Sequence, residues 1–319
     1  MKKDSNSEWY VVVNPQAGNN KTRADWPDIR KLLEAEGFNM ECVFTEYQYH
    51  ATKLVKKAVQ KNGVRKIIVV GGDGTLNEVL NGVFSQNTVS TTDIAIGVIT
   101  VGTGNDWGRM YGIPQDYLEQ IKIIKHNNTF LQDVGKVKYL HHNKEKTHYF
   151  INIAGMGFDA LVAKKSNIAK QKGAGGAFSY MFNLITGLFQ FTYNFIEIDT
   201  ENERIFSGKV FSMSVGICKY NGGGMMQLPF AKPDDGLFDV TVIRKVSRLK
   251  VLRNIKNLYD GSFIKIKEVE TFTGNQFTVT AVPKKSVFLE TDGESLGHSP
   301  LHFTLLPLAA KVIIKENPN

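Results

Sequence analysis

The 319-residue sequence contains only two cysteines, Cys42 and Cys218, which lie far apart and outside any cysteine-rich motif. This usage argues against a disulfide framework and against a cysteine-ligated zinc site. Continuous apolar runs never approach the ~20 residues that a membrane-spanning helix needs. The apolar run at residues 9–13 is also too short for the core of a secretory signal, so we expect a cytoplasmic protein.

Hydrophobic residues make up 42% of the chain, and no tract is of low complexity, so a chain of this length can bury two cores. The first half alternates apolar strand patterns with helical patterns, which predicts a doubly wound α/β domain with a mostly parallel sheet. The expected strands are residues 9–13, 40–44, 67–70 and 94–99, and the expected helices are residues 26–36, 52–61 and 75–84.

After about residue 130 the pattern changes to short alternating segments that predict a mainly antiparallel β domain. These segments are residues 132–139, 149–153, 195–199, 209–215, 238–244, 276–281 and 287–290. We therefore expect an α/β domain at residues 1–130 and a β-rich domain at residues 131–307.

The formal net charge is +8, which favours an anionic partner. Basic residues concentrate between Arg244 and Lys267, where Asp260 is the single carboxylate. Apolar residues at helical spacing after Ser247, ending at Gly261, predict a basic amphipathic helix there. Such a helix either binds a membrane surface or is a solvated face over a core, and both interpretations stay open. Nucleic acid is disfavoured, because no recognised binding motif accompanies the charge.

The segment from Gly71 to Glu78 is the most informative in the chain, because three glycines and one carboxylate lie between a predicted strand and a predicted helix. Backbone N–H groups in such a turn can face an anion, and glycine lets the main chain approach phosphate oxygens closely. Asp73 suits a magnesium ion or its bound water, and Thr75 suits a helix cap. The turn is therefore typical of phosphate binding.

Two further turns of the same kind follow predicted strands, at residues 14–21 and at residues 100–109. The carboxyl ends of neighbouring parallel strands meet at one edge of a sheet, where ligands bind in open α/β folds. We therefore expect the three turns to line one crevice.

Five blocks in this order resemble the diacylglycerol kinase-like lipid kinases, in particular the small soluble bacterial ones related to sphingosine and ceramide kinases. They are Val13-Asn14-Pro15 with Gly18, Gly71-Gly72-Asp73-Gly74-Thr75 with Asn77-Glu78, Gly102-Thr103 with Asn105-Asp106, Asp235-Gly236-Leu237, and Asp292-Gly293-Glu294. The glycine-rich turn by itself also occurs in NAD kinases and phosphofructokinases. The five blocks together span nearly the whole chain and are specific.

The resemblance implies an ATP-dependent kinase that transfers the γ-phosphoryl group to a lipid hydroxyl, most simply diacylglycerol to phosphatidic acid. It implies an ATP cleft between a nucleotide-binding domain, residues 1–130 joined by residues 308–319, and a lipid-binding domain at residues 131–307. An NAD kinase-like enzyme for a soluble substrate and a non-catalytic nucleotide-binding regulator remain open as alternatives.

The resemblance also implies roles for individual residues. Glu294 would be the catalytic base, with Asp73 as a second catalytic residue, and Asp73 and Asp106 would lie near the magnesium ion of the nucleotide. A second, structural magnesium would bind Asp235 and the carbonyl of Leu237, but its third ligand would fall at Lys232, a cation and thus a departure from the family. The nucleotide would contact Asn14, Pro15, Gly18, Thr45, Gly71, Gly72, Gly74, Thr75, Asn77, Gly102, Thr103, Asn105 and Asp106.

The aromatic-rich stretch at residues 178–191 either fills a core or lines an acyl-chain groove, and the sequence does not separate these. We expect peripheral association with the inner face of the membrane, with the lipid substrate and anionic phospholipid as partners. A homodimer is left open.

Overall fold

The computed structural model describes residues 8–102, 104–171, 186–283 and 287–315. The chain divides into two compact units, one formed by residues 1–132 with 308–319 and the other by residues 133–307. Within the described residues, none of the helices is both long enough and apolar enough to cross a bilayer.

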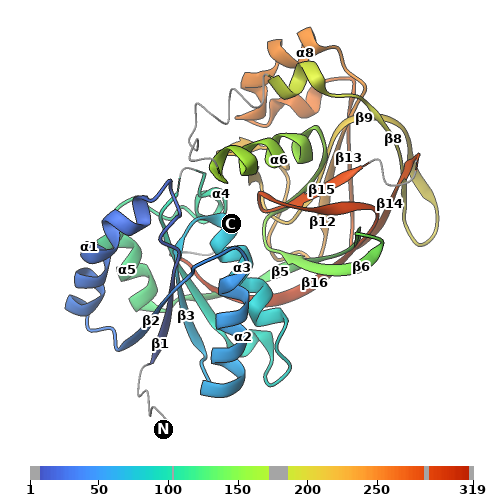
Figure 1. Ribbon diagram of the computed structural model, residues 1–319. Helices are drawn as coiled ribbons and strands as arrows, with labels where there is room; N and C mark the ends of the chain where they lie inside the picture. The colour runs from blue at the N-terminus through green and yellow to red at the C-terminus, as the bar shows by residue number, and fades with distance from the viewer. Residues whose placement is uncertain (1–7, 103, 172–185, 284–286, 316–319) are drawn as a thin grey trace. The chain divides into compact units, whose positions relative to one another are not determined.

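The first unit is built on a parallel sheet, drawn in blue and cyan in Figure 1 except for its last strand, which is red. Its strands run in the order β2 (Met40–Phe44), β1 (Trp9–Val13), β3 (Lys66–Gly71), β4 (Ala95–Thr100) and the end of β16 (Glu294–Ile313). The last strand enters through Lys311 and Val312, which pair with Ala95 and Ile96 of β4. Residues Val11, Val12, Val69 and Val70 are fully buried, as a sheet covered on both faces requires.

Helices cover both faces of this sheet, as the doubly wound prediction requires (Figure 1). On one face α1 (Lys21–Ala35) and α5 (Tyr117–His126) contribute Ile29, Leu33 and Ile121 to one apolar cluster with the strands. On the other face α2 (His50–Asn62) packs against α3 (Asp73–Phe84). A Cβ at Gly82 would lie 2.7 Å from the Val55 Cβ, so glycine permits this close approach. The remaining helices are the 3-10 helix η1 (Thr91–Asp93) and α4 (Asp106–Met110).

The second unit is mainly antiparallel, which confirms the β-rich prediction. Its main path runs β13 (Val269–Gly274), β12 (Phe238–Arg244), β9 (Arg204–Gly216), β7 (Ile153–Gly157), β15 (Phe288–Thr291) and β16. The other strands are β5 (Thr129–His141), β6 (Lys144–Phe150), β8 (Asn194–Asp199), β14 (Gln276–Val282), β10 (Tyr220–Asn221) and β11 (Met225–Met226). Its core is centred on Phe150, Phe238, Phe277 and Phe303, which are buried in one apolar cluster.

The helix predicted after Ser247 is shorter than expected, and this part of the prediction is wrong. Ser247 does cap α8 (Arg248–Arg253), since its Oγ accepts the Lys250 N–H at 3.3 Å. The helix ends at Asn254, whose side chain donates to the Lys250 carbonyl at 2.8 Å and so competes with the helical backbone. The chain continues as the short 3-10 helices η2 (Ile255–Leu258) and η3 (Ser262–Lys265).

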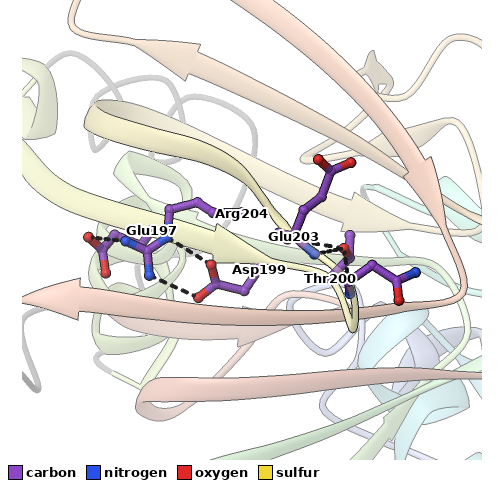
Figure 2. Close-up of polar contacts among 6 residues, drawn as sticks. Glu197, Asp199, Thr200, Glu203 and Arg204 are labelled. Carbon is purple, nitrogen blue, oxygen red and sulfur yellow. Dashed lines mark hydrogen bonds and ion pairs between the residues drawn. The ribbon is translucent and has the colours of Figure 1, made fainter.

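The hairpin that joins β8 to β9 is held by side-chain contacts on its surface. Figure 2 shows Arg204 bonded to Glu197 and Asp199, each at 2.8 Å, while Thr200 bonds to the backbone of Glu203. Exposed ion pairs of this kind contribute little to stability, typically ~0–1 kcal/mol, so the hairpin depends mainly on its backbone ladder.

Candidate active site

The turns that follow β1, β3 and β4 lie against one another at one edge of the parallel sheet. A Cβ at Gly18 would lie 3.6 Å from the Gly102 Cα, and a Cβ at Gly102 would lie 3.5 Å from the Gly72 Cα. The Val101 N–H also donates to the Gly71 carbonyl at 2.8 Å. The structure therefore brings together three of the predicted nucleotide-binding segments in the first unit.

A side-chain hydrogen bond ties the first turn to the second. Asn14 Nδ2 donates to Thr75 Oγ1 at 2.9 Å, and Asn14 Oδ1 accepts the Gln16 N–H at 3.0 Å. A Cβ at Gly71 would fall 2.5 Å from the same Thr75 hydroxyl, so only glycine fits there. The predicted cap by Thr75 is wrong. Gly72 is the N-cap of α3, without a side-chain cap, because the buried Thr75 hydroxyl is directed to Asn14 instead.

Asp73 ties the second turn to the third. Its Oδ2 accepts the Asp106 N–H at 3.0 Å and its Oδ1 accepts the Trp107 N–H at 3.1 Å, so one carboxylate supports the first turn of α4. A negative charge is favourable at a helix N-terminus. The side chain of Asp106 itself is buried.

The other predicted nucleotide-binding residues of the first unit differ in their exposure and in their hydrogen-bond partners. Thr45 follows β2, and its N–H donates to the Val13 carbonyl at 2.9 Å, while Pro15 and Gly74 are partly accessible in their turns. Asn77 is only 1% exposed and bonds to Asn81 within α3. Asn105 Nδ2 donates to the Gly102 carbonyl at 3.2 Å, and its buried Oδ1 has no hydrogen-bond partner among the described residues. Thr103 lies outside the described residues.

In the second unit, the Asp292-Gly293-Glu294 turn connects β15 to β16 and is held from two sides. Gly293 N–H donates to Glu290 Oε2 at 2.9 Å, and Asn167 of α6 (Phe158–Gln171) donates to the Gly293 carbonyl at 3.1 Å. Asp292 is buried, and its carboxylate accepts the backbone N–H groups of residues 151, 152 and 153 at 3.0–3.1 Å. Asp292 therefore holds the turn, and Glu294 is left partly accessible at the start of β16.

Two carboxylates next to this turn, the buried Glu290 and the half-buried Asp159, were missed by the sequence analysis. Burial, and secondarily the neighbouring Asp159, raises the pKa of Glu290 to about 8. Burial raises the pKa of Asp159 to about 6, although the Ser212 and Ser214 hydroxyls favour its charged form. A Cβ at Gly155 would lie 2.4 Å from Glu290 Oε1 and 2.9 Å from the Asp159 Cβ, so glycine leaves room for the pair. Glu290 is the first residue of the Glu-Thr-Asp-Gly-Glu block, and its position there could have marked it as a candidate. No sequence motif marks Asp159.

Asp159 lines an apolar cavity of about 50 Å³ in the second unit. Its polar lining is connected by hydrogen bonds, since Ser214 Oγ contacts Asp159 at 3.2 Å and Gln227 at 2.9 Å. The apolar lining consists of Phe158, Val162, Phe211, Met225, Ile243, Val251, Ile255, Leu258 and Phe263. The volume of this cavity is well below the about 300–1,000 Å³ of small-molecule sites, so the cavity could admit only a small apolar group. Of the predicted aromatic stretch, residues 172–185 lie outside the described residues.

Comparison with known proteins agrees with this arrangement. Residues 8–137 match the family model of the diacylglycerol kinase catalytic domain, and residues 152–314 match that of the YegS C-terminal NAD kinase beta sandwich-like domain. The chain belongs to the diacylglycerol kinase-like lipid kinases. Membership in a kinase family supports a phosphotransferase that uses a nucleotide.

Individual proteins of known name align with most of this lipid kinase family member. A diacylglycerol kinase of Staphylococcus carnosus (strain TM300) is 29% identical over 294 residues, which is 92% of this chain and 90% of that protein. A crystal structure of a diacylglycerol kinase from Bacillus anthracis matches with a TM-score of 0.69 at 23% identity, covering 97% of both chains. A yeast NADH kinase complexed with NADH matches with a TM-score of 0.55 at 10% identity, covering 98% of this chain and 84% of that one. The two structural matches show a shared fold.

The structural magnesium that the resemblance implies at Asp235 and the Leu237 carbonyl stays a prediction. Asp133 closes the loop around Asp235, because its carboxylate accepts the Gly236 N–H and its own N–H donates to the Pro233 carbonyl, both at 2.8 Å. Asp235 Oδ1 accepts the Leu237 N–H at 3.1 Å.

Charged side chains of both signs lie around this loop. Burial, and secondarily Asp235, raises the pKa of Asp239 to about 6, while the positive charge of Lys232 acts in the opposite direction. Among the described residues, no group of three or more His, Cys, Asp or Glu side chains is arranged to hold a metal ion. The cation at Lys232 thus stands where the third ligand was expected.

Proposed function

We propose that the protein is an ATP-dependent lipid kinase that phosphorylates the hydroxyl of diacylglycerol to form phosphatidic acid. The observation that carries the proposal is the convergence of the Gly18, Gly72 and Gly102 turns, held together by Asp73. Phosphoryl transfer needs positioning and charge neutralisation more than covalent help, and this arrangement supplies fixed backbone near one point.

The first unit would hold the triphosphate of ATP against these turns, since glycines let phosphate oxygens approach the backbone. Magnesium bound with the nucleotide would neutralise part of the phosphate charge. A carboxylate oxygen suits a magnesium-bound water, and Asp73 also keeps the Asp106 backbone in place.

Glu294 would act as the general base in the second unit. As the new bond forms between the lipid hydroxyl oxygen and the γ-phosphorus, Glu294 accepts the hydroxyl proton, the bond to the leaving oxygen breaks and ADP departs. The hydrogen bonds of Gly293 to Glu290 and Asn167 support this role, because they restrict the turn that carries Glu294.

The comparisons support a lipid acceptor, because the matched family and the curated relatives are named diacylglycerol kinases. Exposed apolar side chains on α8 support membrane attachment, since Leu249 is 57% exposed and stands between the basic residues Arg248 and Lys250. Apolar and basic side chains on one surface helix are typical of binding to anionic lipid. We propose peripheral association with the inner face of the membrane.

The test is a phosphorylation screen in mixed micelles containing diacylglycerol, with NAD as the soluble control acceptor. The proposal expects radiolabelled phosphatidic acid, with a rate that rises when anionic phospholipid is added and falls with added salt. Phosphorylation of NAD with none of any lipid would overturn it in favour of a soluble-substrate kinase. Nucleotide binding without transfer to any acceptor would favour a regulator.

A further inference from the structure

A second cavity in the second unit, of about 440 Å³, has no role in the proposed reaction. This volume falls within the range of about 300–1,000 Å³ that small-molecule sites occupy. Part of its lining is apolar, with Ala160 from α6, Phe288 and Leu289 from β15, and Leu296 from β16. Phe288 is 52% exposed. Half-exposed aromatic and aliphatic side chains around a cavity favour an apolar ligand group.

The rest of the lining is basic or able to carry a proton. Lys164 lines the cavity, and its Nζ lies 5.0 Å from the centre of the Phe288 ring. None of the carboxylates in the described part of the chain forms an ion pair with Lys164. The cavity therefore presents an uncompensated positive charge beside an apolar surface, which suits a ligand that is both anionic and apolar.

Two histidines in the lining have defined hydrogen bonds. Nδ1 of His141 contacts the Leu296 carbonyl at 3.1 Å, and Nδ1 of His298 contacts the Ser299 carbonyl at 2.9 Å. A carbonyl oxygen only accepts, so each Nδ1 carries a proton and donates it to the carbonyl. The Nε2 of each ring can then exchange a hydrogen bond with a phosphate group.

Ser295 adds a buried polar atom to the lining. Its Oγ has no hydrogen-bond partner among the described residues, although it is shielded from solvent. Buried polar atoms in folded proteins are nearly always hydrogen-bonded, so this hydroxyl points to a group supplied from outside the chain. A phosphate oxygen would be a suitable acceptor for it.

We propose that this cavity binds a phosphate monoester with an apolar tail, such as a lysophosphatidate or phosphatidate. The phosphate would contact Lys164, Ser295 and the imidazoles, and the tail would lie along Phe288 and Leu296. The proposal concerns binding alone and does not depend on the kinase reaction.

The experiment measures binding by isothermal titration calorimetry to the full chain without nucleotide. Dihexanoyl phosphatidate below its critical micelle concentration is compared with dihexanoylglycerol and inorganic phosphate. Lys164→Gln should weaken phosphatidate binding about tenfold or more, as expected for loss of a charge-assisted contact. It should leave dihexanoylglycerol binding unchanged. Inorganic phosphate should bind at least tenfold more weakly than phosphatidate, because it lacks the tail.

Matched variants control for fold and for general charge. Lys165→Gln removes the neighbouring cation, whose amine donates to Gln190 at 2.6 Å. Phe230→Ser removes another exposed phenylalanine, 63% accessible, that does not line the cavity. Both should bind phosphatidate within about twofold of wild type, whereas Phe288→Ser should weaken it. Lys164→Arg should restore binding, which separates loss of charge from loss of fold. Equal binding by Lys164→Gln and Lys165→Gln would overturn the proposal. So would equal affinity for phosphate and phosphatidate, or equal weakening of both lipids by Lys164→Gln.

Discussion

Asn14 and Thr75 are joined by a side-chain hydrogen bond of 2.9 Å although 61 residues separate them along the chain. The bond links the end of β1 to the first turn of α3 and keeps two of the three glycine-rich turns in a fixed relation. The bond is partly shielded from solvent, so its loss should lower the free energy of unfolding by a measurable amount.

Thr75→Val removes the acceptor of this bond while nearly preserving the side-chain shape. We expect the free energy of unfolding to fall by about 1 kcal/mol and the KM for ATP to rise, because the first turn loses its anchor. Urea unfolding and steady-state kinetics measure the two effects. Thr75→Ser keeps the hydroxyl and is the matched control. Equal stability and equal KM in Thr75→Val would show that the bond has no part in nucleotide binding.

Asp73→Ala should reduce turnover at least ~100-fold, since it removes a carboxylate beside the phosphate turns. Both carboxylate oxygens of Asp73 also accept backbone N–H groups of α4. We therefore also expect a loss of about 1–3 kcal/mol in stability. Asp73→Asn, which keeps one acceptor, should be the more stable variant. Near-normal turnover in either folded variant would remove this turn from the mechanism.

Glu294→Gln keeps the size of the side chain but cannot take a proton. We expect kcat to fall by about 10² to 10⁴ while ATP affinity changes little. Glu203→Gln, on the β8–β9 hairpin of the same unit (Figure 2), should leave kcat unchanged. If Glu294→Gln retains most of its kcat, another group accepts the proton. Asp292 is then a poor substitute, because its carboxylate is occupied by three backbone N–H groups.

Glu290 should make stability depend on pH. Its pKa is raised from 4.5 to about 8 in the folded state, so folding retains a proton that the unfolded chain loses. The contribution of Glu290 to the free energy of unfolding is fully present below about pH 4.5. It declines as the pH rises toward 8, by at most ~1.4 kcal/mol per pH unit. Glu290→Gln should flatten this decline in urea unfolding series, whatever its absolute stability. An unchanged slope would show that Glu290 does not hold the proton.

Chelation should leave the thermal stability of the nucleotide-free protein unchanged. The loop around Asp235 is closed by Asp133, and Lys232 supplies positive charge where a metal ligand was expected. Differential scanning calorimetry with and without EDTA measures this. A fall in Tm on chelation that magnesium restores would show a structural metal in spite of Lys232.

Much of the architecture was predictable from local patterns. Runs of β-branched residues followed by glycine-rich turns and helical spacing predicted a parallel sheet with its turns at one edge. The strand order β2-β1-β3-β4 was not predicted and comes from the structure. Alternating segments after residue 130 predicted antiparallel strands for the same kind of reason, because the period of a strand is a local property.

The sequence by itself determined the elements, the two classes of domain and the glycine-rich turns, since backbone preference and hydrophobic period act over a few residues. Only the tertiary structure decided the partners of the polar groups. Thr75 bonds to Asn14 rather than capping its own helix, Asp73 supports α4, and Asp159 lies beside Glu290. These contacts join residues far apart in the chain, and they depend on strand register and on packing at single glycines, which no local pattern encodes.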